Sequence, residues 1–488
     1  MIRPLKESWL QTRRLFVVLL ALGLFTMAVR NITDPDVWWH LRTGELILQT
    51  HSIPHADPYS FTRQGQPWLD HEWLTQMLIY GLYHLAGWAG LMIAFAAVVA
   101  ASFFIVFLRC EGRPYIAGLM TAWGALASIP CWGVRPQVLT VLLASILLLI
   151  LERSYKQPRL LWWIPPLLLL WVNLHAGYAL GLGLLCLFLL GDALDRAFYG
   201  DAPPRLRLRR LILVTVVSFA LVPLNPYGLK MYLYPWQTLH SRAMQAYIGE
   251  WFSPDFHQGR YLATLFMILT ALLLPAVSPK RPNAREILLL VCTTFLALRS
   301  VRHIPIFVLV AVPMLSAMLQ GVLEHAGKVR LFDGQAGSPR RLKLVFNAVI
   351  FVCFVVFSGA RLRTVIAGQR SAEAQEYPQA AADFLAKARP PGRLLNHYNW
   401  GGYLIWKLYP AEKVYIDGRA DLYGDAFLDA FASTYFLRGR NWHDPLVEWD
   451  VRTVMLPPDA PLVVALKTQS EWKSAFSDRQ AVVLIKVR

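Results

Sequence analysis

Two carboxylates followed closely by aromatic and basic side chains stand in the run NITDPDVWWHLRTGE, residues 31–45. A carboxylate beside an apolar segment is a candidate general base, because it can accept the proton of an incoming nucleophile. Asp36 is the stronger candidate, since Asp34 precedes a proline and is well placed to cap a helix that begins there. Trp38 and Trp39 could also be residues of the membrane interface.

A second set of candidate residues is basic and lies near the ends of later apolar segments. Arginine suits phosphate binding because its planar fork can donate two hydrogen bonds and stays charged. The candidates are Arg135, Arg299 and Arg302, with His303 beside the last of them. The sequence leaves alternatives open, because Arg302 could extend its side chain to the membrane interface and His175 could hydrogen-bond a neighbouring helix.

The first loop also holds a group of histidines and carboxylates, His51, His55, Asp57, Asp70, His71 and Glu72. These residues could bind a substrate or a metal, but their spacing matches no defined zinc motif. The simpler interpretation is a turn at Asp57 and a helix cap at residues 70–72.

Composition decides what kind of chain must position these residues. Of 488 residues, 56% are hydrophobic and 16% are charged, against about 45–50% and 25% in soluble domains. These values exclude an ordinary soluble enzyme and a disordered chain. The 5 cysteines are scattered singly, with no metal or redox pair among them.

Apolar segments long enough to be membrane spans recur along most of the chain. Residues 73–87 are predicted instead to form an interfacial amphipathic helix, because polar residues recur there at helical spacing. The sequence therefore predicts a mostly α membrane protein with about eleven transmembrane helices. The predicted segments are 15–29, 88–108, 114–130, 136–152, 160–172, 176–191, 209–224, 260–278, 286–298, 303–320 and 343–360.

The positive charges predict the orientation. With the N-terminus in the cytoplasm, the inner segments carry 22 Lys and Arg residues and the outer segments up to the last span carry 8. The positive-inside rule then places the C-terminus outside, as expected for an integral protein of the cytoplasmic (inner) membrane. The same asymmetry explains much of the net charge of +17 without a nucleic-acid partner.

The chain is predicted to have two domains. Residues 1–360 form the transmembrane domain, with long outer loops at 30–72 and 225–259. Residues 361–488 form an extracytoplasmic α/β domain, since apolar runs of strand length (393–395, 413–416, 453–456 and 481–486) alternate there with helical stretches (380–387 and 426–435).

The run from Asp36 to Arg42 resembles the D-P-W-F-N-Y-R type signature in the first outer loop of oligosaccharyltransferase catalytic subunits, which belong to the GT-C superfamily of glycosyltransferases. The resemblance implies that an acidic residue after the first span serves catalysis at the outer face, with a polyprenyl-linked or dolichyl-linked sugar as donor. The matching position is Asp36, with Asp34 as second choice. Trp38, Trp39, His40 and Arg42 become candidates for acceptor or substrate binding, as does His175.

Three further segments resemble elements of the same family in the same chain order. Residues 247–251 resemble the T-I-x-E element, which makes Glu250 a catalytic candidate, and residues 298–303 resemble the segment that binds the lipid phosphate. Residues 398–403 resemble the W-W-D-Y-G motif of acceptor-peptide recognition. Gly401 replaces the Asp of that motif, which argues against Asn-X-Ser/Thr peptides as acceptors. The candidate acceptor residues in this segment are Asn399, Trp400, Gly402 and Tyr403.

One element of the family is missing. Relatives carry a second acidic pair that completes a metal site, whereas residues 131–137 (CWGVRPQ) contain no carboxylate. Mg²⁺ or Mn²⁺ held by Asp36 and Glu250 alone would have few of the oxygen ligands that these ions require. The cofactor is therefore unknown, and Arg135 could neutralise the donor phosphate directly.

The sequence thus predicts a membrane glycosyltransferase that moves a sugar or glycan from a polyprenyl-phosphate-linked donor to a glycan, lipid or protein acceptor. Membrane lipids are expected to surround the protein. Two alternatives remain. A glycan polymerase or ligase could use Arg and His in place of a carboxylate. A lipid-linked-sugar transporter would be no enzyme, but it should carry polar residues in mid-membrane and an internal repeat, which the sequence lacks.

Overall fold

The computed structural model describes residues 12–200, 204–328 and 340–487. The chain divides into two compact units, each assembled from three segments. The helical unit comprises residues 1–30, 92–228 and 250–367, and the mixed unit comprises residues 31–91, 229–249 and 368–488.

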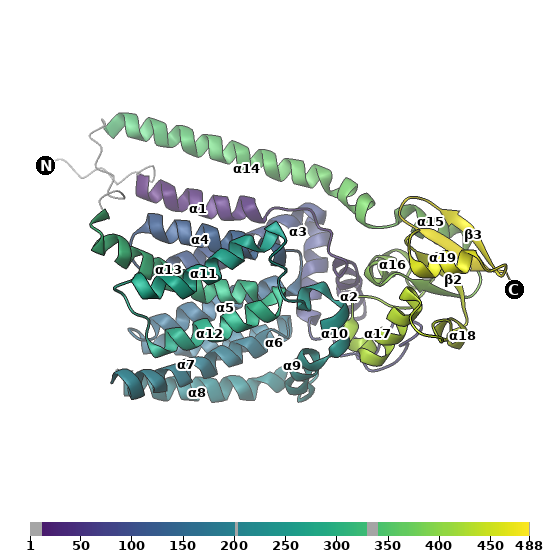
Figure 1. Cartoon of the computed structure of the whole chain (residues 1–488), viewed down its shortest axis with the longest axis horizontal. Coiled ribbons are helices and arrows are strands. Elements are labelled where there is room, and N and C mark those ends of the chain that lie inside the picture. The colour runs from purple at the N-terminus through teal and green to yellow at the C-terminus, as the bar shows by residue number, and fades with distance from the viewer. Residues whose placement is uncertain (1–11, 201–203, 329–339, 488) are drawn as a thin grey trace. The chain divides into compact units, whose positions relative to one another are not determined.

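The helical unit is a bundle of helices that run side by side (Figure 1). Helix α13 is its most buried member and packs against α4, α11 and α12. The helices are α1 (Thr12–Ala28), α4 (Pro114–Ser128), α5 (Pro136–Arg153), α6 (Ile164–Leu174), α7 (Tyr178–Tyr199), α8 (Arg205–Leu221), α11 (Leu262–Val277), α12 (Ala284–Arg299) and α13 (Ile304–His325). Short 3-10 turns join several of them, including η1 (Ile129–Cys131), η2 (Pro158–Trp163), η3 (Val222–Leu224), η5 (Gly259–Tyr261) and η6 (Val301–His303).

Two long helices, α3 (Trp73–Arg109) and α14 (Arg340–Glu376), contribute residues to both units. Helix α3 is bent at Gly87, whose φ of 58° belongs to the left-handed region that favours glycine. The bend separates the predicted interfacial helix, residues 73–87, from the apolar segment that follows.

Each of the eleven predicted apolar segments overlaps a helix, but the described residues contain 6 helices long and apolar enough to cross a membrane. They begin at Trp73, Pro136, Tyr178, Gly259, Val301 and Leu342. The predicted number of eleven spans is therefore not confirmed, because several of the other helices are shorter than a bilayer requires.

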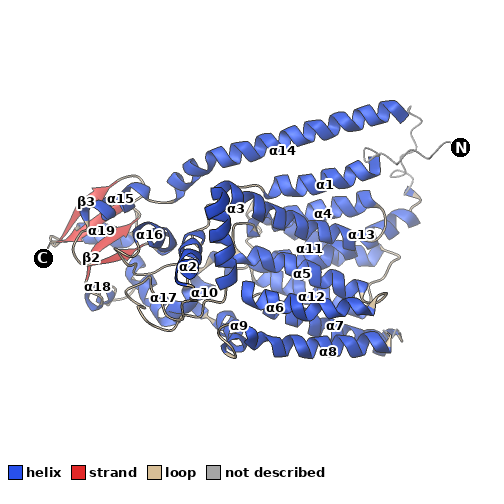
Figure 2. Cartoon of the chain, turned by 180° about the vertical axis from the view of Figure 1, so that it is seen from behind, coloured by secondary structure: helices blue, strands red, loops and turns tan. Residues whose placement is uncertain are grey.

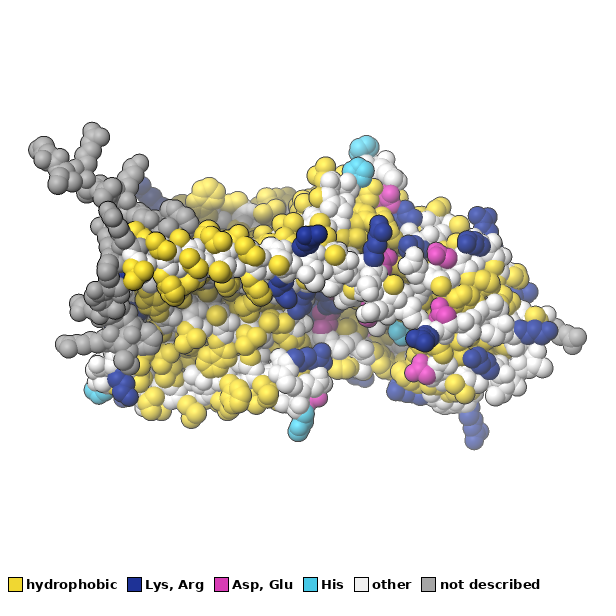
Figure 3. Space-filling view, turned by 90° about the horizontal axis from the view of Figure 1, so that it is seen from above, with side chains coloured by type: hydrophobic (Ala, Val, Ile, Leu, Met, Phe, Trp, Pro, Cys, Tyr) yellow, Lys and Arg dark blue, Asp and Glu magenta, His cyan; other side chains and the backbone are white. Residues whose placement is uncertain are grey.

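Apolar side chains also cover much of the outer surface of the helical unit (Figure 3). Helix α14 is exposed along its apolar part, since only 11% of its most apolar 18-residue stretch is buried. Large exposed side chains on this helix include Val345, Phe346, Val349, Val352 and Val356. A surface of this kind is stable against lipid tails rather than water.

The mixed unit contains a four-stranded sheet of order β1-β2-β4-β3 surrounded by short helices (Figure 2). Strand β1 (Arg393–Asn396) is parallel to β2 (Val451–Leu456), and β4 (Val482–Lys486) is antiparallel to β2 and to β3 (Trp472–Ser477). The helices are α2 (Val37–Thr50), α9 (Lys230–His240), α10 (Arg242–Tyr247), α15 (Gln379–Ala388), α16 (Gly401–Leu408), α17 (Ala420–Phe436), α18 (Asp444–Glu448) and α19 (Pro461–Lys467).

The first outer loop is part of the same unit as the C-terminal sheet. The backbone of Val414 pairs with the loop, donating to the carbonyl of Tyr59 at 3.2 Å and accepting from the amide of Phe61 at 3.1 Å. The apolar run 413–416, predicted as a strand, forms only this isolated bridge. Side chains of α17 hold the second outer loop, since Asp425 accepts a hydrogen bond from Ser241 at 2.5 Å and Asp429 accepts one from Tyr247 at 2.8 Å.

The predicted boundary at residue 360 falls inside a helix. Helix α14 continues to Glu376, and the mixed unit takes up the chain from Gly368. The residues after 360 are less hydrophobic than those before, but they include Arg, Ala, Gln and Glu, which are good helix formers. The helix therefore continues beyond the end of the apolar run.

Candidate functional site

The helical unit brings together an arginine cluster consisting of Arg135, Glu250, Trp251, Arg302 and His303. Three short turns position it, η1, η6 and η4 (Gly249–Trp251). Hydrogen bonds join the turns, because Ser300 Oγ donates to the Glu250 carbonyl at 2.9 Å and the Val301 amide donates to the Phe252 carbonyl at 2.9 Å.

Within the arginine cluster the two arginines have different partners. Arg135 forms an ion pair with Glu250 at 2.8 Å, and their side chains are 27% and 26% exposed. The guanidinium of Arg302 lies 4.4 Å from the centre of the Trp251 ring. Among the described residues no carboxylate lies within ion-pair distance of Arg302, so its charge is available to an anionic ligand.

The other basic candidates lie nearby in the same unit. Arg299 is exposed at the end of α12, and His303 is half-buried with its ring centre 6.4 Å from that of Trp251. His303 Nδ1 has no hydrogen-bond partner in the described part of the chain.

His175 is a buried residue whose Nδ1 lies 2.8 Å from Thr140 Oγ1 and accepts a hydrogen bond from the Gly177 amide. Trp171 Nε1 donates to the same Thr140 hydroxyl at 3.0 Å. These contacts show that Nδ1 of His175 is hydrogen-bonded within the helical unit, and a role of His175 in substrate binding stays a prediction.

In the mixed unit, Asp36 lies at the start of α2. Its Oδ1 accepts a hydrogen bond from Trp39 Nε1 at 3.0 Å. The backbone of Gly418 is so close that a Cβ at this position would lie 1.8 Å from Asp36 Oδ1. Gly418 and Trp39 together therefore fix the orientation of the Asp36 carboxylate, which is half-buried.

Asp34 has a different environment. Its Oδ1 accepts a hydrogen bond from the backbone amide of Asp36 at 2.9 Å, and its carbonyl accepts one from the amide of Val37. Asp34 therefore organises the turn that begins α2, as predicted for a capping residue, although the helix starts two residues after Pro35 and not at it.

Most of the predicted acceptor residues near Asp36 are part of the protein core. Trp38 is 1% exposed and packs edge-on against Trp88, Tyr377 and Tyr403. His40 is 2% exposed, and burial lowers its pKa to about 4 despite the nearby Glu72 carboxylate. Both side chains are thus buried in this structure, and their contact with an acceptor stays a prediction.

Arg42 also has a structural contact. It pairs with Glu45 at 2.5 Å and donates to the carbonyl of Tyr409 at 2.7 Å, with its guanidinium over the rings of Trp406 and Tyr409. These bonds tie the end of α16 to α2, so Arg42 has little freedom to bind a substrate.

The candidate acceptor residues in the segment 398–403 also differ in their exposure. Asn399 is exposed, whereas Trp400 is 7% exposed and Tyr403 is fully buried. A Cβ at Gly402 would lie 2.5 Å from the carbonyl oxygen of Pro35, so this glycine allows α16 to approach the start of α2 closely. Trp400, Gly402 and Tyr403 are therefore buried and Asn399 is accessible, and an acceptor role for these four residues stays a prediction.

A buried group that we call the clasp was not anticipated from the sequence, where Asp57 was interpreted as a turn residue. Arg419 is 2% exposed and forms ion pairs of 2.7 Å with both Asp57 and Asp417. Its guanidinium also lies over the rings of Tyr59 and Trp68. The clasp joins the first outer loop to the segment that orients Asp36. Its signal in the sequence was the run Asp-Gly-Arg, in which two charged residues stand within an apolar stretch.

The residues predicted to hold a metal do not fit one well. Glu250 is already paired with Arg135, and Asp36 already accepts an indole N–H. A hard divalent cation requires about six oxygen ligands, and these two carboxylates could supply only a part of them. We therefore derive no chemical step through a metal at Asp36 or Glu250.

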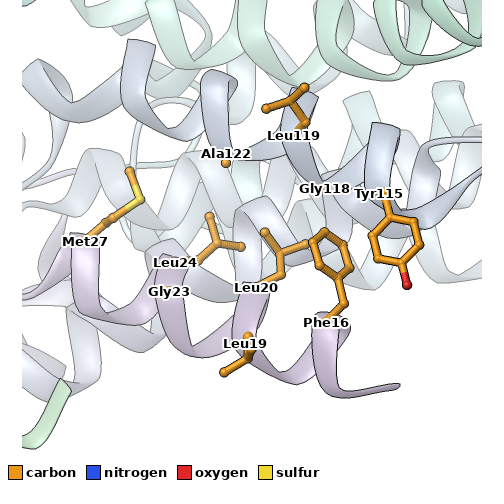
Figure 4. A pocket seen from close by; sticks show the side chains of 10 residues that line it. All are labelled: Phe16, Leu19, Leu20, Gly23, Leu24, Met27, Tyr115, Gly118, Leu119 and Ala122. Carbon is orange, nitrogen blue, oxygen red and sulfur yellow. The ribbon is translucent and has the colours of Figure 1, made fainter. Parts of the chain in front are cut away.

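A groove of about 540 Å³ lies between α1 and α4 in the helical unit and is lined by apolar side chains (Figure 4). Phe16, Leu20 and Leu24 of α1 face it, with Tyr115 and Leu119 of α4. The groove contains no ionisable group except a tyrosine hydroxyl, so it offers a surface for a hydrocarbon chain and no group for sugar transfer.

Comparison with known proteins gives a likeness of fold. No family model and no curated protein sequence matches the chain. The structure of the oligosaccharyltransferase AglB from Archaeoglobus fulgidus, in complex with an inhibitory peptide and a dolichol-phosphate, matches with a TM-score of 0.62 at 11% identity, covering 92% of this chain and 70% of that chain. The apo structure of the Archaeoglobus fulgidus oligosaccharyltransferase matches with a TM-score of 0.57 at the same identity and coverage.

A weaker likeness is to ArnT from Cupriavidus metallidurans bound to undecaprenyl phosphate, with a TM-score of 0.47 at 13% identity, covering 96% of this chain and 97% of that chain. The first two likenesses show that this chain has a fold similar to that of the Archaeoglobus fulgidus oligosaccharyltransferase, the kind of protein that the sequence motifs resemble.

Proposed function

We propose that this protein is a membrane glycosyltransferase that takes a sugar or glycan from a polyprenyl-phosphate-linked donor. The observation that carries the proposal is the arginine cluster, in which Arg302 stacks on Trp251 and keeps its charge available. A phosphate group is the ligand that suits a partly exposed guanidinium of this kind best. The GT-C fold supports the same assignment.

In the proposed reaction a hydroxyl or amide of the acceptor attacks the anomeric carbon of the donor sugar. Asp36 accepts the proton of the nucleophile as the new bond to carbon forms. The bond between the anomeric carbon and the phosphate oxygen breaks, and its electron pair remains on the phosphate. Arg302 stabilises that growing negative charge, with Arg135 or Arg299 as further candidates, because preorganised cations act most strongly where charge develops.

The orientation of Asp36 supports its role as base. Trp39 and Gly418 hold its carboxylate in one position. Glu250, the second catalytic candidate, is proposed to hold Arg135 in place through their ion pair.

The acceptor is proposed only as a class, namely a glycan, a lipid or a protein. Asn399 is the one residue of the acceptor-like segment that remains exposed. We place the reaction at the outer face of the cytoplasmic membrane, with the N-terminus inside and residues 361–488 outside, on the basis of the distribution of Lys and Arg. A reporter that is active only in the cytoplasm and is fused after Arg488 should be silent.

The test of the function is a transfer assay with the purified full-length protein in lipid nanodiscs. A panel of radiolabelled polyprenyl-phosphate hexoses serves as donor, and membrane extract serves as acceptor. We expect label to be transferred from one or more of these donors, and Asp36→Asn to slow transfer by about 10²–10⁴. The matched variant Asp34→Asn should cost little, because Asn caps a helix start as well as Asp does.

Equal loss in both variants would move the base away from Asp36. Full activity in both would favour the second candidate function, a glycan polymerase or ligase that uses Arg302 and His303, which both lie near the Trp251 ring. No transfer or release of label from any donor would contradict a glycosyltransferase of this type.

A further inference from the structure

The apolar groove between α1 and α4 has no part in the proposed reaction (Figure 4). On α1 it extends from Phe16 to Met27, which is about 16 Å of helix, since each residue advances a helix by about 1.5 Å. This length is close to the thickness of one leaflet of the hydrocarbon core, about 15 Å. The groove therefore matches the reach of one lipid chain within a single leaflet.

Small residues on both helices keep the groove open. Gly23 of α1 lines it, and the atom nearest to a Cβ at this position would be in the ring of Phe354 on α14, at 3.6 Å. Gly118 of α4 makes room for the ring of Phe16, which would lie 2.3 Å from a Cβ there. Ala122 lines the groove one turn further along α4, so a large side chain at this position would fill the space.

An arginine bridges the two helices at one end of the groove. Arg30 comes three residues after Met27, and its Nη1 donates hydrogen bonds to the carbonyls of Ile129 and Trp132 at 3.2 and 2.6 Å. Both carbonyls belong to the turn that follows α4. The Arg30 side chain therefore extends from the end of α1 to the end of α4, the two helices that line the groove.

A second arginine reaches the same end from α14. Arg361 donates from Nε to the carbonyl of Thr26 at 2.9 Å and from Nη2 to the carbonyl of Val29 at 3.2 Å. The Thr26 hydroxyl also donates to that of Ser358 at 2.8 Å, which holds α14 against α1. Because the Val29 carbonyl belongs to the peptide bond that precedes Arg30, both guanidinium groups lie at the end of α1.

The positive charge of this Arg30–Arg361 pair is not balanced by nearby acids. The acceptors of both arginines are neutral carbonyl groups, and neither arginine is within ion-pair distance of a carboxylate in the described part of the chain. Arg30 is half-buried and Arg361 is exposed. Cations beside an apolar segment are costly unless an anion accompanies them.

Each arginine also keeps one nitrogen for a ligand. Nε of Arg30 is buried without a hydrogen-bond partner among the described residues, and Nη1 is occupied by the two carbonyls. Nη2 of Arg30 and Nη1 of Arg361 are therefore the groups that an anion can contact. A phosphate oxygen suits them, because a guanidinium stays charged and donates several hydrogen bonds in one plane.

We propose that the groove and the Arg30–Arg361 pair form a binding site for an anionic phospholipid, with its phosphodiester on the two guanidinium groups and one acyl chain in the groove. A phospholipid combines the two parts that this site can hold, an apolar chain and a negative phosphate. The length of the groove, about that of one leaflet, favours an acyl chain over the longer chain of a polyprenyl phosphate.

The proposal is independent of the glycosyltransferase assignment. It uses neither Asp36 nor any member of the arginine cluster. A phospholipid in this position would connect the ends of α1, α4 and α14, because Arg30 contacts the turn after α4 and Arg361 belongs to α14.

The test uses the full-length protein, purified in detergent and washed free of lipid. Binding of dioleoyl phosphatidylglycerol and of dioleoyl phosphatidylcholine is measured by native mass spectrometry. The two lipids have the same chains, but only phosphatidylglycerol has a net negative charge. We expect one tightly bound phosphatidylglycerol per chain and at least about tenfold weaker binding of phosphatidylcholine. Equal affinities, or no bound phosphatidylglycerol, would contradict the proposal.

Arg30→Ala and Arg361→Ala should each weaken phosphatidylglycerol binding by about tenfold, because each removes a charge-assisted contact. The matched control is Arg363→Ala. Arg363 is also exposed on α14, but residues two apart on a helix do not share a face, so its removal should change the affinity by no more than about twofold. An equal loss in this control would indicate a general attraction to the protein surface and would overturn the site.

The groove is tested by Ala122→Phe, which should fill it and weaken binding of both lipids by about tenfold or more. Its control is Ala97→Phe, which adds the same ring at an exposed position of α3 and should leave the affinity unchanged. Unchanged binding in a folded Ala122→Phe variant would show that the acyl chain does not lie in the groove. Arg361 is exposed, so Arg361→Ala should keep the melting temperature even if Arg30→Ala does not.

Two further measurements decide which lipid and which arginines are involved. Arg302→Ala should still retain one phosphatidylglycerol, and its loss in that variant would place the lipid at the arginine cluster instead. Undecaprenyl phosphate at an equal concentration should not displace phosphatidylglycerol. Displacement that depends on Arg30 would assign the site to a polyprenyl chain and overturn the choice of a phospholipid.

Discussion

Charged side chains are used differently in the two units. In the arginine cluster of the helical unit, Arg135 and Glu250 each keep about a quarter of the side chain exposed, and Arg302 rests on an aromatic ring. In the clasp of the mixed unit, Arg419 is buried and bonded to two carboxylates. Partly exposed charges can reach a ligand that arrives from solvent, whereas a buried charge that is paired within the protein helps to hold the fold together.

This difference between the two units also bears on the family motifs, because several residues that match them are buried. Trp38, His40 and Tyr403 are buried, although the motif made them candidates for acceptor binding. In this region the motif describes how the first outer loop packs on the C-terminal domain. The groups that remain open to chemistry are Asp36, Asn399 and the arginine cluster.

The largest expected effect is the loss of protein stability when the clasp is broken. Arg419→Met removes one partner of a buried ion network and leaves Asp57 and Asp417 uncompensated, which should lower the free energy of unfolding by about 3–5 kcal/mol. The measurement is thermal unfolding of the full chain in detergent. The control Arg452→Met breaks an exposed ion pair with Asp450 and should change stability by no more than about 1 kcal/mol. Similar small effects in both variants would show that the clasp does not hold the unit together.

The next effect concerns the position of Asp36. Gly418→Ala places a methyl group where Asp36 Oδ1 now lies, so the carboxylate must move. A displacement of this size should slow transfer by about 10² while donor binding is retained. The control is Gly81→Ala, because nothing lies within 4 Å of a Cβ at that position. A normal transfer rate in a folded Gly418→Ala variant would contradict the role of Asp36 as base.

A smaller effect is expected for the arginine cluster. Arg302→Ala removes a charge-assisted contact worth about 1.5–3 kcal/mol, so the affinity for undecaprenyl phosphate should fall by about tenfold to a hundredfold. Arg260 offers a matched control, since its guanidinium also stacks on a neighbouring ring, that of Tyr261 at 4.9 Å. Unchanged affinity in Arg302→Ala would transfer the phosphate-binding role to Arg299 or Arg135.

The smallest expected effect is on the way in which the stability of the mixed unit depends on pH. Burial against Trp400 and Tyr435 lowers the pKa of His397 to about 4. The unfolded chain takes up a proton at this residue near pH 6.5, so the stabilising contribution is complete above 6.5 and is lost as the pH falls toward 4. The loss should amount to about 1–2 kcal/mol because the ring is partly exposed.

The measurement is the difference in melting temperature between pH 7.5 and pH 4.5 for the unmodified protein and for His397→Phe. Phenylalanine keeps the ring contacts and cannot be protonated. His40 also has a lowered pKa and titrates in both proteins, so the informative quantity is the difference between them. An identical pH dependence would show that folding does not lower the pKa of His397.

A good part of this protein could be predicted from the sequence. Hydrophobicity and helical periodicity are local properties, and they located the apolar helices and the small α/β domain. Asp36 and Arg302 became candidates because charged residues beside apolar segments are costly and therefore informative. Glu250 became one through the resemblance of its segment to a family element. The similarity of fold to an oligosaccharyltransferase agrees with the resemblance of short motifs that occur in the same chain order.

Burial, however, was decided only by the tertiary structure. Asp57 lies 360 residues before Asp417 in the chain, and a single arginine binds both. Whether Trp38 faces an acceptor or the core depends on Trp88, Tyr377 and Tyr403, which come from three other elements. A motif gives the type of a side chain and its spacing, but exposure depends on what distant segments pack against it, and that is a property of the folded chain.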